Sequence, residues 1–227
     1  MSVGGQSVME SKERTRLVYE SLAGFYNTFR SRNGFGKMRR LLSLEDGMSL
    51  LDCGTGPGKY AYLLAKKHPD VVVYGMDICE NFLRIARRRV EARGVSNLVL
   101  VGGDAESLPF SDETFDRILC AGVLLLLQDK ENAVSEMYRV LKKGGLLVVV
   151  EPKKTFLPWR ALFYALVLPA VMKFASFKEP SVAKAKREDY GGRKFSPDEL
   201  KALLTSAPFA SVDVQVKATQ MFAVCRK

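Results

Sequence analysis

The stretch at residues 50–58, Leu-Leu-Asp-Cys-Gly-Thr-Gly-Pro-Gly, constrains the fold of this chain more than any other. Its apolar half ends at Cys53, and three glycines follow at alternate positions, Gly54, Gly56 and Gly58. A helical pattern begins directly afterwards. Glycine adopts positive φ and has no Cβ, so a ligand can lie against the backbone here. A strand, a glycine turn and a helix N-terminus predict a nucleotide-binding turn in an α/β fold.

Apolar runs alternate with amphipathic stretches along the chain, which is typical of an α/β sheet. The predicted strands are 48–53, 71–77, 98–102, 115–121, 146–151, 211–217 and 220–225, and the predicted helices are 59–67, 80–93, 130–142 and 196–206. Asp129 is the predicted cap of the helix at 130–142 and Gly144-Gly145 its predicted stop, and Ser196 with Glu199 forms a predicted capping box at the start of the last helix. The last two strands are too close for a crossover, so they pair antiparallel. We therefore predict a Rossmann-like, seven-stranded mixed sheet with its last strand antiparallel. Helices at 13–43 precede it, and a helical insertion follows strand 5.

Composition limits the class of protein. We predict one domain over 13–227, after a flexible tail at 1–12, with 152–195 as a cap over the substrate. Four scattered cysteines and a polar N-terminus predict a cytoplasmic protein without a metal site or disulfide framework. The net charge of +10 favours an anionic partner, or simply serves solubility. His68, the only histidine, precedes a proline turn and argues against Ser-His-Asp catalysis.

The residues around the glycine turn indicate which ligand it binds. A dinucleotide fingerprint needs a third glycine where this chain has Lys59, and Asp52 before the turn suits an ammonium group better than a pyrophosphate. Asp77 ends the second strand, where a carboxylate accepts ribose hydroxyls; alternatively, it only caps the next helix. Asp104 and Ala105 follow the third strand and could bind the amino group and ring of adenine, or form an ordinary acidic turn.

These motifs resemble those of the class I S-adenosylmethionine-dependent methyltransferases, as do Thr114-Phe115-Asp116 and the segment 137–145. Within that class the chain is most similar to the ubiquinone/menaquinone biosynthesis C-methyltransferases, whose N-terminal helix carries a stretch like 23–27, Ala-Gly-Phe-Tyr-Asn. Tyr26 would there close over the methionine end of the cofactor, or be a core aromatic residue. The resemblance implies S-adenosylmethionine as cofactor and the following cofactor-binding residues: Tyr26, Asp52, Gly54, Thr55, Gly56, Gly58, Asp77, Ile78, Asp104, Ala105 and Cys120.

The acceptor side departs from the quinone enzymes. They carry an Arg-Asn pair after the fourth strand, and many relatives a His-His pair, where this chain has Gly122 and a leucine run. The apolar segment 161–172, between Arg160 and Lys173, is too short to span a membrane. It could be a lid, an interfacial helix on anionic lipid or a core helix. The candidate acceptor-site residues are Leu125, Trp159, Tyr164 and Tyr190.

The predicted activity is in-line methyl transfer to a small lipophilic acceptor, quinone-like or lipid-like, with peripheral contact to an anionic membrane. An oxygen or carbon nucleophile also needs a base. Tyr26, Glu151, Asp189 and Tyr190 are weak candidates, so no catalytic residue is assigned. An RNA methyltransferase is an alternative suggested by the charge, although no RNA-binding module is evident. A non-catalytic S-adenosylmethionine-binding protein is another alternative.

Overall fold

The computed structural model describes residues 35–153, 194–217 and 220–227 of the 227. Its helical elements are α2 (Phe35–Leu42), α3 (Lys59–Lys67), α4 (Glu80–Glu91), the short 3₁₀ helix η1 (Leu124–Leu126), α5 (Lys130–Val140) and α8 (Pro197–Leu204). Its strands are β1 (Ser49–Cys53), β2 (Val72–Asp77), β3 (Leu98–Gly102), β4 (Phe115–Ala121), β5 (Leu141–Pro152), β6 (Ser211–Lys217) and β7 (Gln220–Arg226).

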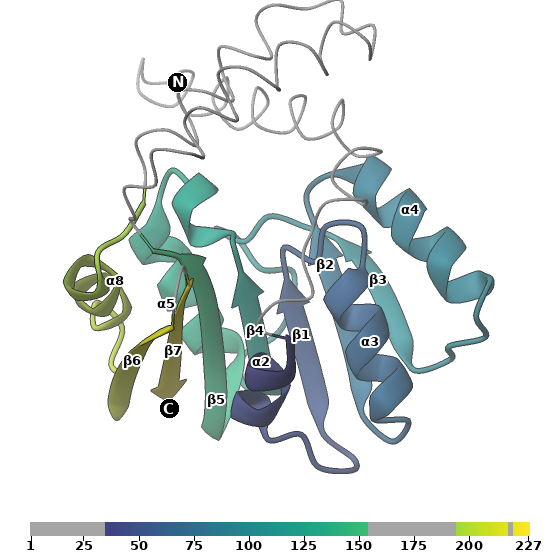
Figure 1. Cartoon of the computed structure of the whole chain (residues 1–227), viewed down its shortest axis with the longest axis horizontal. Helices are drawn as coiled ribbons and strands as arrows, with labels where there is room; N and C mark the ends of the chain where they lie inside the picture. The colour runs from purple at the N-terminus through teal and green to yellow at the C-terminus, as the bar shows by residue number, and fades with distance from the viewer. Residues whose placement is uncertain (1–34, 154–193, 218–219) are drawn as a thin grey trace, which may run out of the picture.

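The seven strands form one sheet in the order β3-β2-β1-β4-β5-β7-β6 (Figure 1). The five strands from β3 to β5 are mutually parallel, whereas β7 pairs antiparallel with both β5 and β6. The predicted mixed sheet with its last strand antiparallel is therefore confirmed. The sheet also places β7 inside, between β5 and β6, and leaves β3 and β6 as the two edge strands.

Helices cover both faces of the sheet, which explains why its central strands carry buried continuous apolar runs such as Leu146–Val150. On one face, α2 and α3 pack over a cluster that joins Leu42, Leu64 and Val73. On the other face, α5 and α8 pack over a second cluster, which includes Phe115 and Leu147. In Figure 1, α2 and α3 lie in front of the sheet and α5 lies behind it. The burial of these two clusters fixes the strand ends that carry the candidate site.

Local sequence signals place most helix ends correctly. Asp129 caps α5 by accepting a hydrogen bond from the Asn132 N–H at 2.9 Å, as predicted. Ser196 and Glu199 form the capping box predicted at the start of α8. The predicted helix over 130–142, with Gly144-Gly145 as its stop, is too long, since α5 ends at Val140 and β5 begins with Leu141.

The two glycines belong to β5 because they pair with the last residue of the chain. The Gly144 N–H donates to the Lys227 carbonyl at 2.9 Å, and the Lys227 N–H donates to the Gly145 carbonyl at 3.2 Å. The register of β4 against β5 shifts between Phe115 and Arg117, so β5 reaches its regular pairing at Leu146. The strand signal predicted at 146–151 is thus the regular half of a longer strand.

Candidate active site

The strand order reverses at β1, whose neighbours are β2 and β4. Ligands of open α/β sheets bind at such a switch point, outside the carboxyl ends of the strands. Here the loops that leave β1 and β4 begin with Gly54 and Gly122, and Cys53 lies beside Cys120 in the parallel register. The predicted glycine turn therefore sits where the topology opens a crevice.

The glycine turn needs glycine for both its backbone and its packing. The φ angles of Gly54, Gly56 and Gly58 are +70°, +57° and +71°, a region that L-residues with a side chain rarely adopt. A Cβ at Gly54 would lie 2.3 Å from a Val123 methyl carbon, and one at Gly58 would lie 2.6 Å from the Ala86 Cβ. The turn is thus pressed between the loop after β4 and helix α4.

Two buried carboxylates hold the turn in this shape. Asp52, only 1 % exposed, accepts a hydrogen bond from the Thr55 hydroxyl at 2.7 Å. Asp77 accepts one from the Gly56 N–H at 2.7 Å with one oxygen and one from the Cys79 N–H at 2.9 Å with the other. The structure therefore brings the predicted acids to the turn, with Asp52 behind it as a support of Thr55.

Asp77 is not the N-cap residue of α4. The helix begins at Glu80 with Cys79 as its N-cap residue, and the Cys79 side chain makes no capping hydrogen bond. A carboxylate can accept about four hydrogen bonds, so Asp77 can hold the turn and accept from a ligand hydroxyl together. Ile78, the next residue, is 45 % exposed. An apolar side chain in that position offers a surface for a planar ring.

The residues predicted to bind adenine follow β3. Asp104 accepts a hydrogen bond from the Glu106 N–H at 2.9 Å through its carboxylate, and its carbonyl accepts one from the Ser107 N–H at 3.1 Å. The predicted acidic turn is therefore present, with Ala105 buried within it. The Glu106 carboxylate accepts from the Gln128 N–H at 2.8 Å, which ties this loop to the start of α5.

The loop after β4, predicted to lie on the acceptor side, folds into η1, an element that the leucine run did not reveal. The Glu151 carboxylate, 1 % exposed at the end of β5, accepts hydrogen bonds from the N–H groups of Val123 at 3.0 Å and Leu124 at 2.9 Å. This places Val123 against Gly54. Leu125 is buried, while Leu126 is half-buried and packs beside Phe82. Glu151, a weak candidate for a base, thus positions this loop.

The thiols near the turn are held neutral. Burial raises the pKa of Cys53 well above its usual range, and the charge of Asp52 raises it further. Burial also raises the pKa of Cys120, and the neighbouring Cys53 raises it further. Neutral thiols are poor nucleophiles, so neither Cys53 nor Cys120 is a candidate nucleophile.

One further contact at the turn was missed from the sequence. The Arg89 guanidinium, half-buried on α4, donates to the Pro57 carbonyl of the turn. Burial lowers the pKa of Arg89, and the neighbouring Arg93 charge adds to this effect. Arginines are frequent on α4 and most face solvent, so no local pattern distinguishes the one that faces the turn.

Several predicted residues lie outside the described part of the chain. They are Tyr26, Trp159, Tyr164, Asp189 and Tyr190. Among the residues that are described, no group of three His, Cys, Asp or Glu side chains could hold a metal ion. No helix in the described ranges has both the length and the apolar content for a membrane crossing.

Known proteins resemble this chain over most of its length. Residues 51–149 match the family described as methyltransferase domain. Demethylmenaquinone methyltransferase of Geobacillus kaustophilus is 31% identical over 220 residues, 91% of this chain and 92% of the relative. The enzyme of the same name from Anoxybacillus flavithermus is 33% identical over 221 residues, 91% of this chain and 90% of the relative. The chain belongs to the class I S-adenosylmethionine-dependent methyltransferases.

The fold agrees with this family. A crystal structure of an S-adenosylmethionine-dependent methyltransferase from Aquifex aeolicus superposes with a TM-score of 0.67 at 21% identity, covering 89% of this chain and 97% of the other. The protein is therefore an enzyme that uses S-adenosylmethionine as its methyl donor. The exposed Ile78 and the carboxylate of Asp77 fit the shape and polarity of that cofactor's nucleoside half.

Proposed function

We propose that this methyltransferase acts on a small, lipophilic, quinone-like acceptor. The observation that carries the proposal is the apolar loop beside the glycine turn. Glu151 fixes its backbone, and Val123 contacts Gly54. An apolar wall next to a methyl donor suits an apolar acceptor better than a charged one. The relatives from Geobacillus and Anoxybacillus carry the name of demethylmenaquinone methyltransferase, which supports the same acceptor class.

The proposal includes the residues that hold the cofactor. Asp77 accepts the ribose hydroxyls, Ile78 lies against the adenine ring, and Asp104 accepts from the adenine amino group, as the positions of these residues after β2 and β3 suggest. The glycine turn leaves room for the cofactor's methionine half to lie against the backbone, since Gly54, Gly56 and Gly58 have no Cβ. Asp52 acts through Thr55, since the Asp52 carboxylate is buried behind the turn.

Methyl transfer depends more on how the cofactor and the acceptor are oriented than on reactive side chains. When bound, S-adenosylmethionine supplies an electrophilic methyl group on a sulfonium; the carbon–sulfur bond breaks as the acceptor's nucleophile bonds to carbon, and the electron pair stays on sulfur. Holding two reactants in line supplies roughly 7–11 kcal/mol of the barrier reduction in favourable cases. A carbon acceptor then loses its proton to a base. The loop fixed by Glu151 serves to align the acceptor ring with the methyl group.

The test is incubation with methyl-labelled S-adenosylmethionine and three acceptors: a prenylated demethylated quinone in vesicles, a total lipid extract and a total RNA extract. We expect label in the quinone, and its loss in Asp77→Ala. Glu45→Ala is the matched control, because Glu45 is an exposed acid before the opposite end of β1. Label in RNA alone would replace the proposal with RNA methylation. Cofactor binding without label in any of the three acceptors would overturn the proposed acceptor class.

We propose further that the enzyme works in the cytoplasm with peripheral contact to an anionic membrane, where a lipophilic acceptor is dissolved. The basis is the sequence alone: the apolar run 161–172 is bounded by Arg160 and Lys173, and the net charge is +10. Basic residues near an apolar face attract anionic headgroups. In a flotation assay we expect binding to anionic vesicles at low salt, release at high salt and no binding to neutral vesicles. Absence of binding to anionic vesicles at low salt would contradict this part.

A further inference from the structure

Helix α4 touches the glycine turn at two places on one side of the helix. A Cβ at Gly58 would lie 2.6 Å from the Ala86 Cβ, so the backbone of the turn passes directly over this small residue. Three residues further along α4, the Arg89 guanidinium donates to the Pro57 carbonyl. Residues three apart are neighbours on the surface of a helix, so α4 presents Ala86 and Arg89 together to the turn.

The Pro57 carbonyl takes its donor from outside helix α3. That helix begins at Lys59 with Gly58 as its N-cap residue, and the Gly58 carbonyl accepts from the Tyr62 N–H at 3.0 Å. Pro57 comes before the first carbonyl that the helix uses, and it is buried. A buried carbonyl without a hydrogen bond costs free energy, whereas a guanidinium gives it a charge-assisted one. Arg89 thus satisfies a group that α3 leaves open.

Two side chains of opposite charge hold neighbouring parts of the turn. Asp77 accepts from the Gly56 N–H at 2.7 Å, and Arg89 donates to the carbonyl of the next residue, Pro57. Together they fix the peptide groups on either side of the Gly56–Pro57 bond. The turn needs this support because glycine has more backbone freedom than any other residue, and the glycines on both sides of Pro57 lie at positive φ.

Arg89 differs in its surroundings from the other arginines of α4. Arg84, Arg87 and Arg88 are exposed, whereas Arg89 is half-buried. Burial lowers the pKa of Arg89, and the charge of Arg93, one helical turn further on, lowers it further. The charged guanidinium is therefore held against an electrostatic cost, which the hydrogen bond to the turn offsets.

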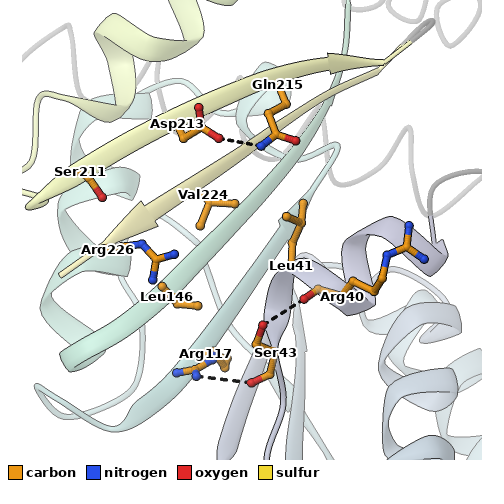
Figure 2. Close-up of a pocket in the computed structure, with 10 residues that line it drawn as sticks. All are labelled: Arg40, Leu41, Ser43, Arg117, Leu146, Ser211, Asp213, Gln215, Val224 and Arg226. Carbon is orange, nitrogen blue, oxygen red and sulfur yellow. Dashed lines mark hydrogen bonds between the residues drawn. The ribbon is translucent and has the colours of Figure 1, made fainter.

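A second half-buried arginine makes the same kind of contact away from the cofactor turn. Arg117 lines a groove of about 350 Å³ near the end of α2 and donates to the carbonyls of Leu42 at 2.7 Å and Ser43 at 3.4 Å (Figure 2). It is the third residue of β4, whose last residue is Ala121. At about 3.3 Å per residue, Arg117 lies roughly 13 Å along the strand from the loop that follows β4. Arg117 therefore supports the fold alone and is a structural comparison for Arg89.

We propose that Arg89 is a positioning residue for methyl transfer. By holding the Pro57 carbonyl, it sets the backbone against which the methionine half of S-adenosylmethionine lies, and with it the position of the methyl group. This inference rests on the proposed placement of the cofactor at the glycine turn. A turn that is ordered before binding loses less conformational entropy when the cofactor binds, so the contact raises cofactor affinity.

Calorimetric titration of Arg89→Met with S-adenosylmethionine tests this role. Methionine keeps a long side chain of similar helix propensity but donates no hydrogen bond. We expect Kd to rise at least about fivefold. The affinity for 5′-methylthioadenosine, which lacks the amino-acid part of the cofactor, should change by less than about twofold, because the nucleoside contacts remain. Arg89→Lys keeps a charged donor and should weaken S-adenosylmethionine binding only about twofold. Arg89→Gln replaces the methionine variant if that variant does not fold.

Two matched controls separate this role from charge and from stability. Arg88→Met removes an exposed charge from the same helix, and Arg117→Met removes the comparable contact to backbone carbonyls. Both should bind S-adenosylmethionine like the wild type, although Arg117→Met should melt at a lower temperature. Unchanged affinity in Arg89→Met, an equal loss in either control, or an equal loss for 5′-methylthioadenosine would overturn the proposal.

Asp77→Ala, titrated in parallel, distinguishes this inference from the cofactor placement on which it rests. If Asp77→Ala binds S-adenosylmethionine as the wild type does, the cofactor does not lie at the turn, and the placement itself fails. If Asp77→Ala binds weakly while Arg89→Met binds like the wild type, the placement stands and only the role of Arg89 fails.

Discussion

Replacing Gly54 by alanine tests how the cofactor turn and the acceptor loop are built against each other. The change forces a side-chain residue to φ +70°, which costs about 1–2 kcal/mol. It also puts a Cβ 2.3 Å from a Val123 methyl carbon, and overpacking of this kind costs about 1–3 kcal/mol. We therefore expect a loss of about 2–5 kcal/mol in the free energy of unfolding.

Gly122 provides the matched control. Its φ is +71°, but a Cβ there would meet nothing within 4 Å. Gly122→Ala should therefore lower the free energy of unfolding only by the cost of the positive φ angle, about 1–2 kcal/mol. The free energies come from urea unfolding, and cofactor affinity comes from calorimetric titration. For a domain of this size, each kcal/mol corresponds to roughly 2–4 °C in melting temperature.

The double variant Gly54→Ala/Val123→Ala separates contact from backbone strain. Truncating Val123 removes the two clashing methyl groups. The double variant should therefore lose about 1–3 kcal/mol less free energy of unfolding than the two single variants lose together. Cofactor affinity should recover in parallel. If Gly54→Ala costs no more than Gly122→Ala, or if Val123→Ala brings no recovery, then Val123 does not press on the turn and the reasoning fails.

Three more predictions follow from buried or paired groups. Asp77→Ala should weaken S-adenosylmethionine binding at least about tenfold in calorimetry, because the Gly56 N–H loses its acceptor; unchanged affinity would contradict its ribose role. For Asp116, burial alone would raise the pKa, but hydrogen bonds from Ser49 and Lys142 outweigh it and lower the pKa. The stabilisation that the ionised Asp116 contributes is thus fully present above the unfolded pKa near 4, and it is lost as the pH falls through the folded pKa. Asp116→Asn should therefore make the free energy of unfolding depend less on pH in the acid range. Burial raises the pKa of Cys225 to about 12, so a thiol reagent at pH 8 should modify it only after denaturation; rapid native modification would show that the strand opens.

The sequence predicted those parts of the site that depend on neighbours along the chain. A few consecutive residues predict the glycine turn and Asp77 at the end of β2. The same holds in the fold for the capping box of Ser196 with Glu199. The bounds of β3 and β4 were predicted to the residue, and a glycine directly follows each strand, Gly103 after β3 and Gly122 after β4.

The contacts that shape the site join residues far apart in the sequence. Val123 meets Gly54 across 69 positions, and Glu151 reaches back to Val123 across 28. Periodicity carries no information on such pairs, so η1 and the role of Glu151 needed the structure. The glycine pair in β5 misled the helix prediction for the same reason: its partner, Lys227, lies at the end of the chain.

The position of β7 has a consequence for how the sheet is assembled and kept soluble. This strand comes last in sequence but lies inside the sheet, where its Ala223 pairs with Val149 of β5. Until it docks, β5 has an open edge with the buried run Leu146–Val150 along it, and an apolar open edge is a template for intermolecular pairing. A shortened or slowly docking β7 should therefore leave a collapsed, aggregation-prone intermediate rather than a smaller stable domain.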